Sequence, residues 1–265
     1  MLARALGLER ARLVSLCGAG GKTTLMLALA AELATAGERV LITTTTKIAR
    51  DEAVGTWPAI AAAGAEEVLD LAGRMTAEDG AARPGALIAY AKSCREGERL
   101  AGFAPEVIDT LKQAPRFDRI LVEADGSARK PLKAPARHEP VIPSTTDVVI
   151  VVAGLSGVGC PLDDEHLFRP EIWARLTGIA LGSPVTARSV AAIATHADGL
   201  TKGCPEHAER ILFLNQVDAP GRRTDAKTIC ELVGAARTRN IGRIVCGRLL
   251  PRPEIVHIAS FAARP

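Results

Sequence analysis

Short apolar runs alternate with helical segments along most of this chain. The apolar runs lie at residues 12–16, 39–43, 119–123, 147–153, 210–214 and 241–246. Runs of this length, rich in β-branched residues, are typical of strands that are buried on both faces of a sheet. Helical patterns separate several of them, as at 25–33 and 105–113. The alternation predicts an α/β fold with three layers, in which helices cover both faces of a mostly parallel central sheet.

The pattern is less regular between residues 51 and 102. Gly- and Ala-rich pieces dominate there, and only 86–90 has the character of a strand. We therefore expect an insertion in this part of the fold, and the pattern leaves its form open. A chain of 265 residues is long enough for one large α/β domain, which we expect to cover 1–265. The stretch 220–265 either completes the sheet of this domain or is appended to it.

Composition and charge narrow the classes of function. The net charge of +3 is spread along the chain without a basic block, which argues against nucleic-acid binding. No apolar run reaches the ~20 residues that a bilayer-spanning helix needs, and residues 1–9 lack the apolar core of a signal peptide. The six cysteines are widely spaced, and we expect them to be reduced thiols. These features predict a cytoplasmic protein with no nucleic-acid or membrane partner.

The most informative motif follows the first predicted strand. Residues 18–24 read Gly-Ala-Gly-Gly-Lys-Thr-Thr and lead directly into the helical segment 25–33. A strand, a Gly-rich turn and a helix in this order hold the phosphates of a nucleotide, because backbone N–H groups and the helix start face the anion. Lys22 adds a full positive charge, and Thr23 offers its hydroxyl to Mg²⁺. Phosphate contacts are expected from Gly18, Ala19, Gly20, Gly21, Lys22, Thr23 and Thr24.

This loop departs from the commonest form of the motif. The standard pattern has a further glycine, separated by four residues from the Gly-Lys pair, where this chain has Leu16. The shorter Gly-x-x-Gly-Lys-Thr-Thr pattern is similar to the phosphate loops of Mur-ligase-like enzymes. The alternative is a Gly-rich turn followed by a surface lysine, but the full Gly-Gly-Lys-Thr-Thr sequence favours a nucleotide. The sequence therefore predicts the three-layer fold of a P-loop NTPase.

Acidic residues follow the third predicted strand, at the edge where open α/β sheets bind ligands. Glu123 and Asp125 lie directly at its end, with Gly126 next to them. Either acid could hold the water shell of Mg²⁺ or orient an attacking water, as the second metal contact of a P-loop enzyme requires. We therefore assign Lys22, Glu123 and Asp125 as candidate catalytic residues, and Thr23, Glu123 and Asp125 as candidate metal ligands.

Other polar residues near these strand ends have two interpretations each. The second strand ends in the run 43–47, Thr-Thr-Thr-Thr-Lys, which either reaches the metal and phosphates or caps the next element. The loop after the third strand carries Arg129, Lys130 and Lys133, which either face an anion or form a solvated basic turn. His138 lies in a Pro-rich loop, where it either serves as an acid, a base or a recognition group, or caps a neighbouring carbonyl.

A base-reading element follows the fifth predicted strand. Residues 215–218 read Asn-Gln-Val-Asp, which is similar to the Asn-Lys-x-Asp element of many GTPases. The carboxylate of Asp218 would accept hydrogen bonds from guanine, and adenine lacks that donor pair. Gln216 replaces the lysine whose stem packs on the base, so the motif favours GTP while leaving ATP open. Asn215 and Asp218 are the candidate base contacts.

Taken together, these motifs resemble the YqeC family, which is linked to selenium-cofactor biosynthesis and to selenium-dependent molybdenum hydroxylases. The segments that carry the resemblance are 18–24, 41–48, 122–135, 138–143 and 214–218. The resemblance implies a nucleotide-dependent step in making or inserting a selenium-containing molybdenum cofactor. It also implies a hydroxylase, or one of its cofactor-maturation proteins, as partner.

Three functions are compatible with this sequence. The first is Mg²⁺-dependent hydrolysis of GTP or ATP, coupled to cofactor maturation, in which Lys22 bridges the β- and γ-phosphates. The second is a ligase or transferase that activates an acid as an acyl phosphate, as the Mur-like loop indicates. The third is a nucleotide-gated chaperone without significant turnover, whose affinity for a client depends on the bound nucleotide.

Overall fold

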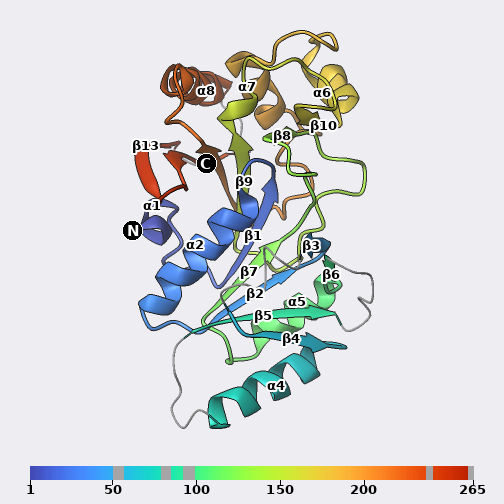
Figure 1. The fold of residues 1–265 in the computed structure, drawn as a ribbon, viewed down its shortest axis with the longest axis vertical. Helices are drawn as coiled ribbons and strands as arrows, with labels where there is room; N and C mark the ends of the chain where they lie inside the picture. Colours follow the sequence, from blue (N-terminus) through green and yellow to red (C-terminus); the bar gives the residue numbers. More distant parts are fainter. Residues whose placement is uncertain (50–56, 79–84, 92–98, 237–240, 262–265) are drawn as a thin grey trace.

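The computed structural model describes residues 1–49, 57–78, 85–91, 99–236 and 241–261. A nine-stranded sheet runs through its centre in the order β13-β12-β11-β9-β1-β7-β2-β5-β4 (Figure 1). Neighbouring strands are parallel except for β12 and β13, which are antiparallel. The strands are β1 (Leu13–Gly18), β2 (Val40–Thr44), β4 (Ala59–Ala62), β5 (Ala86–Ala91), β7 (Arg119–Glu123), β9 (Val148–Gly154), β11 (Glu209–Asn215), β12 (Arg243–Arg248) and β13 (Glu254–Ser260).

Helices cover both faces of this sheet, so the predicted three-layer α/β fold is confirmed and is compatible with a P-loop NTPase. Side chains alternate between the faces of a strand, and this alternation assigns the helices to layers. In β7, Leu121 shares a buried cluster with Leu25 of α2, whereas Ile120 and Val122 share a cluster with Ile108 of α5. The helices are α1 (Leu2–Ala5), α2 (Lys22–Thr35), α4 (Ala65–Glu78), α5 (Pro105–Gln113), α6 (Pro170–Thr177), α7 (Ala187–Thr195) and α8 (Arg222–Ala236).

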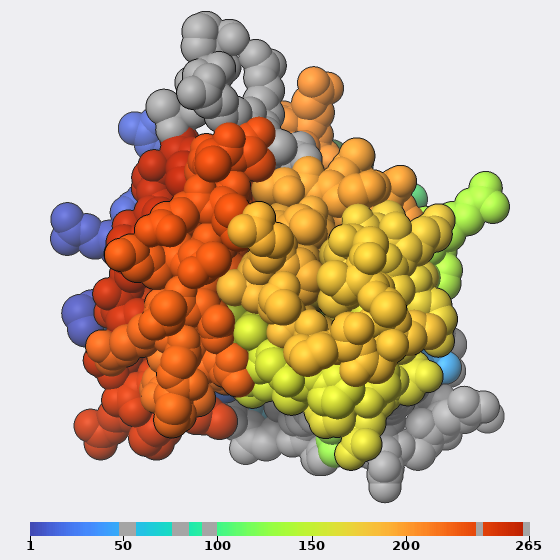
Figure 2. Space-filling view, turned by 90° about the horizontal axis from the view of Figure 1, so that it is seen from above, coloured from blue at the N-terminus to red at the C-terminus, as the bar shows by residue number. Residues whose placement is uncertain are grey.

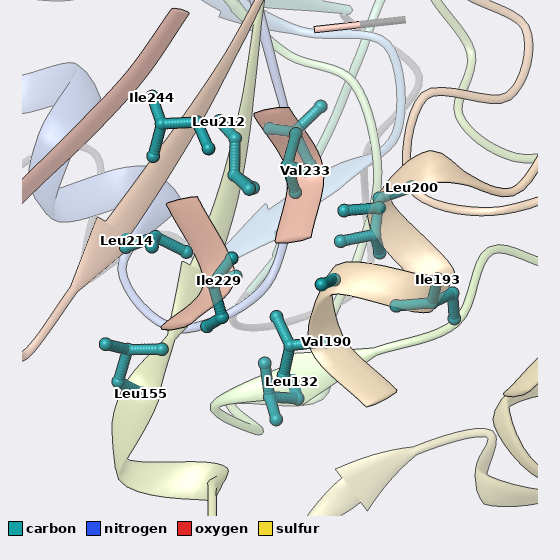
Figure 3. Packing of buried hydrophobic residues seen from close by; sticks show 14 of the residues in the cluster. Leu132, Leu155, Val190, Ile193, Leu200, Leu212, Leu214, Ile229, Val233 and Ile244 are labelled. Atoms are coloured by element: carbon teal, nitrogen blue, oxygen red, sulfur yellow. The ribbon is translucent and has the colours of Figure 1, made fainter. Parts of the chain in front are cut away.

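A third cluster fills the space between the sheet and helices α7 and α8 (Figure 3). Leu212 and Leu214 of β11 point into it, whereas Ile211 and Phe213 point to the α2 face. The apolar residues of all three clusters are nearly inaccessible to water, and this burial is the main driving force for folding. Labelled members of the third cluster in Figure 3 are Leu132, Leu155, Val190, Ile193, Leu200, Leu212, Leu214, Ile229, Val233 and Ile244.

Residues 51–102 and 220–265, whose structure the sequence pattern did not decide, both contribute strands to the central sheet. Within 51–102, β4 and β5 extend the sheet beyond β2, and α4 packs against them. The short strands β3 (Lys47–Ala49) and β6 (Arg99–Ala101) pair beside this edge. Within 220–265, α8, β12 and β13 complete the opposite side of the sheet. The other residues of these regions lie outside the described ranges.

A smaller structure beyond the carboxyl end of the sheet completes the fold. Strand β8 (Leu132–Lys133) pairs in parallel with β10 (Leu167–Phe168), and the short helix η1 (Leu155–Gly157) follows β9. In Figure 1, β8 and β10 lie with α6 and α7 at one end of the molecule, and Figure 2 shows that this end adjoins the segments that follow β11. Within the described residues, no helix is long and apolar enough to cross a membrane.

The packing of the third cluster predicts that a Leu→Ala substitution inside it destabilises the protein far more than the same substitution at the surface. Leu212 is fully buried, so Leu212→Ala should lower the free energy of unfolding by ~2–5 kcal/mol through lost burial and the cavity left behind. Leu181 is 54% exposed, so Leu181→Ala should change it by less than ~0.5 kcal/mol. Urea unfolding of both variants checks this, and equal losses would contradict the assigned core.

Candidate functional site

The predicted phosphate loop lies at the centre of the sheet, where the carboxyl ends of several parallel strands meet. The register aligns Leu16 with Glu123 of β7 and Gly18 with Val152 of β9. Gly18, Gly20 and Gly21 all have positive φ values, of 95°, 84° and 124°. A Cβ on Gly20 would lie 2.5 Å from the Cα of Gly154, so the close packing of the loop requires glycine there. Helix α2 begins at Lys22, directly after this turn.

Lys22 is buried at the start of α2 and faces two carboxylates. Its Nζ donates to the carbonyl oxygen of Gly18 at 2.8 Å and lies 3.4 Å from Asp125 and 3.6 Å from Glu123. Burial opposes the charge, but Asp125 and Glu123 outweigh it, and the pKa of Lys22 is raised above its ordinary value. Lys22 is therefore a fixed cation at the end of the central strands, where a phosphate would compete with the carboxylates for it.

Thr23 and Glu123 form the second polar pair of the site. The Thr23 hydroxyl donates to Oε2 of Glu123 at 2.7 Å. A hydroxyl and a carboxylate are the hard oxygen ligands that Mg²⁺ prefers, and the ion usually takes its other ligands from phosphates and water. The two side chains therefore fit a magnesium site beside the phosphate loop. Among the described residues, no group of three or more His, Cys, Asp or Glu side chains could hold a metal by itself.

Asp125 holds the phosphate loop through hydrogen bonds to its backbone. Its two oxygens accept hydrogen bonds from the backbone N–H of Gly18 at 3.1 and 3.0 Å, and Lys133 donates to it at 2.8 Å. The side chain is almost completely buried. Because its oxygens already hold the loop and a lysine, Asp125 is placed to position the loop. Glu123 is the acid that lies against Thr23, so the geometry favours Glu123 as the metal contact.

Behind the loop lies a buried charge network that the sequence did not reveal. Lys133 donates to Asp125, to the Gly126 carbonyl and to Glu139, at 2.8, 2.6 and 2.7 Å. The guanidinium of Arg169 also donates two hydrogen bonds to the Glu139 carboxylate, at 2.5 and 2.9 Å. Lys133 is thus neither a solvated turn residue nor directed at a ligand. Its apolar neighbours Leu132 and Ala134 were the only sequence signal of burial, and Arg169 lies far away in the chain.

The threonines at the end of β2 and just after it donate hydrogen bonds to backbone carbonyls. Thr43 donates to the Ala89 carbonyl at 2.9 Å, Thr44 to that of Glu123 at 2.7 Å and Thr45 to that of Val141 at 2.7 Å. These bonds fix the end of β2 beside Glu123. They support the interpretation in which the threonines of the run 43–47 cap neighbouring elements. Lys47 is exposed and lines the cleft described below.

The predicted base-reading residues lie at the same edge of the sheet, after β11. The Asn215 side chain donates through Nδ2 to the carbonyl oxygen of Gly20 at 2.7 Å, which joins the phosphate loop to this strand end. The Oδ1 of Asn215 is buried, with no hydrogen-bond partner among the described residues. Asp218 is exposed and lines the same cleft as the loop. Asn215 therefore holds the phosphate loop, whereas Asp218 lies at the surface of the cleft.

A cleft of 1310 Å³ connects these groups. It is lined by six cations, Lys22, Lys47, Arg129, Lys130, Arg169 and Arg248, and by three carboxylates, Glu123, Glu139 and Asp218. This balance favours an anionic ligand. His138 is exposed and does not line the cleft. Burial and the Asp125 charge raise the pKa of the Cys17 thiol well above its ordinary value, which supports a packing role for Cys17.

Comparison with known proteins gives two matches. A family model described as "YqeC protein" matches residues 14–171, which include the phosphate loop, both candidate acids and Arg169. A protein of Escherichia coli (strain K12) named "Uncharacterized protein YqeC" is 34% identical over 247 residues. The aligned region covers 93% of this chain and 91% of that relative, so the likeness extends over the whole fold.

Because of this charge network, we expect the free energy of unfolding to change with pH in the acidic range. Burial raises the pKa of Glu139, but Arg169 and Lys133 outweigh it and lower that pKa from 4.5 to about 2. The stabilisation is complete above pH 4.5 and is lost as the pH falls toward about 2. The free energy of unfolding should therefore fall less steeply over this window in Glu139→Gln than in the wild type.

Urea unfolding at a series of pH values measures this dependence. The exposed Glu206 gives a matched control, because Glu206→Gln should keep the wild-type slope. An unchanged slope in Glu139→Gln would contradict the buried ion pairs.

Proposed function

The chain belongs to the YqeC family, and from this premise we propose that it binds a nucleoside triphosphate with Mg²⁺ and hydrolyses it. The observation that carries the proposal is the buried Lys22, held in a Gly-rich turn between β1 and α2, beside the Thr23–Glu123 pair. A cation, a hydroxyl and a carboxylate at a helix start are the groups that phosphoryl transfer from a nucleotide needs.

Each side chain has a distinct part in the proposed reaction. Lys22 would exchange its contacts with Glu123 and Asp125 for oxygens of the β- and γ-phosphates. Thr23 and Glu123 would hold Mg²⁺, which neutralises the charge that develops on the phosphates. The backbone N–H groups at the start of α2 would orient the phosphates, because they point away from the helix and carry partial positive charge. Asp125 would keep the loop in position throughout.

The family suggests what the nucleotide step serves. We propose that hydrolysis is coupled to the maturation of a selenium-dependent molybdenum hydroxylase, as the YqeC resemblance implies. The proposed partner is the hydroxylase or a protein that matures its cofactor. The size of the cleft favours a second candidate, a ligase or transferase in which the phosphoryl group passes to another substrate.

Base selection rests on the end of β11. Asn215 ties the phosphate loop to this strand end, and Asp218 follows three residues later at the surface of the cleft. A carboxylate at this place can accept two hydrogen bonds from guanine, whereas adenine lacks that pair of donors. We therefore propose GTP as the preferred nucleotide, with ATP as the alternative.

The first test removes the phosphate-binding cation. Lys22→Ala should weaken binding of Mg²⁺-GTP at least about tenfold and abolish phosphate release, because a charge-assisted contact contributes ~1.5–3 kcal/mol. Titration calorimetry and a phosphate-release assay measure the two effects. Lys227→Ala, at an exposed lysine of α8, is the control and should leave both unchanged. Turnover that survives in a folded Lys22→Ala protein would exclude the proposed site.

The second test concerns the base. Asp218→Asn should weaken binding of GTP about tenfold or more and shift preference toward xanthosine triphosphate, whose ring presents an acceptor where guanine presents a donor. Competition binding with GTP, xanthosine triphosphate and ATP measures the shift. Equal affinity of the wild-type protein for GTP and ATP would remove guanine reading from the proposal while leaving phosphate binding intact.

A further inference from the structure

Two buried cysteines lie against each other between helix α8 and the central sheet. The Sγ atoms of Cys230 in α8 and Cys246 in β12 are 3.8 Å apart. The exposed fraction is 8% for Cys230 and 1% for Cys246. All cysteines within the described residues are free thiols, so this pair is reduced in the structure. Neither thiol has a part in the proposed nucleotide reaction, and their contact calls for a chemistry of its own.

The packing of both elements holds the two thiols together. Cys246 aligns with Leu214 of β11, and β12 is paired with a neighbouring strand on each side. Cys230 lies on the buried face of α8 together with Ile229 and Val233. These two residues belong to the same cluster as Leu214 (Figure 3). The contact between the sulfurs is therefore set by the packing of α8 on the sheet.

The distance between the sulfurs suits the formation of a covalent bond. A disulfide joins its two sulfurs at ~2.05 Å, so these sulfurs would have to approach each other by less than ~2 Å. Each sulfur lies one bond beyond its Cβ, and rotation about the Cα–Cβ bond of each cysteine can supply this movement. The reduced pair is therefore close to the geometry of a disulfide.

The two thiols differ in reactivity. A hydrogen bond from the Cys246 thiol to the Cys230 sulfur lowers the pKa of Cys230, although burial opposes this effect. The same hydrogen bond, together with burial, raises the pKa of Cys246. The thiolate is the nucleophilic form of cysteine, and Cys230 is also the more exposed of the two. Cys230 is therefore suited to attack an oxidant, and Cys246 to react with the product.

The pair lies beside the segment that carries Asp218. Helix α8 begins at Arg222, shortly after this residue. On the other side, the Val217 N–H donates to the carbonyl of Gly247 in β12 at 3.3 Å. A bond between α8 and β12 would thus link the helix that follows this segment to the strand that already holds it.

We propose that Cys230 and Cys246 are an oxidation site, at which hydrogen peroxide converts the two thiols into a reversible disulfide between α8 and β12. The Cys230 thiolate attacks one peroxide oxygen, so that an S–O bond forms, the O–O bond breaks, and the released hydroxide takes up the proton that Cys230 gave up. The Cys246 sulfur then attacks the Cys230 sulfur; the S–S bond forms, the S–O bond breaks, and a second water leaves with the Cys246 proton. The sulfurs lose two electrons in total, which the peroxide gains, and a thiol reductant restores the pair.

Peptide mapping of the full chain tests the bond directly. The folded protein is treated with hydrogen peroxide, its remaining thiols are blocked, and it is digested without reductant. Trypsin cleaves after Lys227 and Arg243, so Cys230 and Cys246 fall in different peptides. Mass spectrometry should find these two peptides joined, and dithiothreitol should separate them. Cys160→Ala, which removes a free thiol elsewhere, is the matched control and should leave the joined peptides unchanged.

Urea unfolding then tests whether the bond fits the fold. The oxidised wild type should unfold at a higher urea concentration than the reduced protein, because the crosslink restricts the unfolded chain. Cys246→Ala and Cys230→Ala each lack one partner and should show no such rise on oxidation. The proposal is overturned if the oxidised wild type yields no joined peptides, if Cys230 is oxidised to the sulfinic acid instead, or if the crosslinked protein unfolds at the same or a lower urea concentration. Neither measurement uses a nucleotide, so these failures would leave the proposed function standing.

Discussion

The buried carboxylate of Asp125 connects the phosphate loop, strand β8 and the start of helix α2. It accepts both the N–H of Gly18 in the phosphate loop and the amine of Lys133 in β8, and it lies near Lys22. A buried charge is tolerated only when it is paired and hydrogen-bonded, so these groups require one another. The geometry of the loop and the position of β8 beside it thus depend on the same side chain.

This carboxylate also links the phosphate loop to Arg169 through a continuous set of ionic contacts. From Asp125 the contacts continue through Lys133 to Glu139 and then to Arg169, which lies against Phe168 of β10. A phosphate that draws Lys22 away from Asp125 would change the charge felt by Lys133. Charges interact strongly in such a buried, hydrogen-bonded network, because the local dielectric constant is low.

The sequence predicted the parts of the fold that depend on local pattern. The runs predicted at 147–153 and 119–123 correspond to β9 and β7, because strands covered on both faces are continuously apolar. The turn from Gly18 to Lys22 was recognisable because its residue types stand in the order that is typical of phosphate loops. The edge strand β4 was harder to predict, since its Ala-rich run suits several structures. The partnership of Lys133 with Glu139 and Arg169 depends on the β8–β10 pairing, which no local pattern specifies.

The bond between Asn215 and the Gly20 carbonyl joins residues that are 195 positions apart. The phosphate loop is therefore synthesised long before β11, the strand that carries Asn215. Contacts between such distant residues form slowly, because the loop-closure entropy must be overcome first. A growing chain can therefore fold much of its sheet before the proposed nucleotide site is complete. Binding competence would then arise only after β11 has been synthesised and has paired with β9.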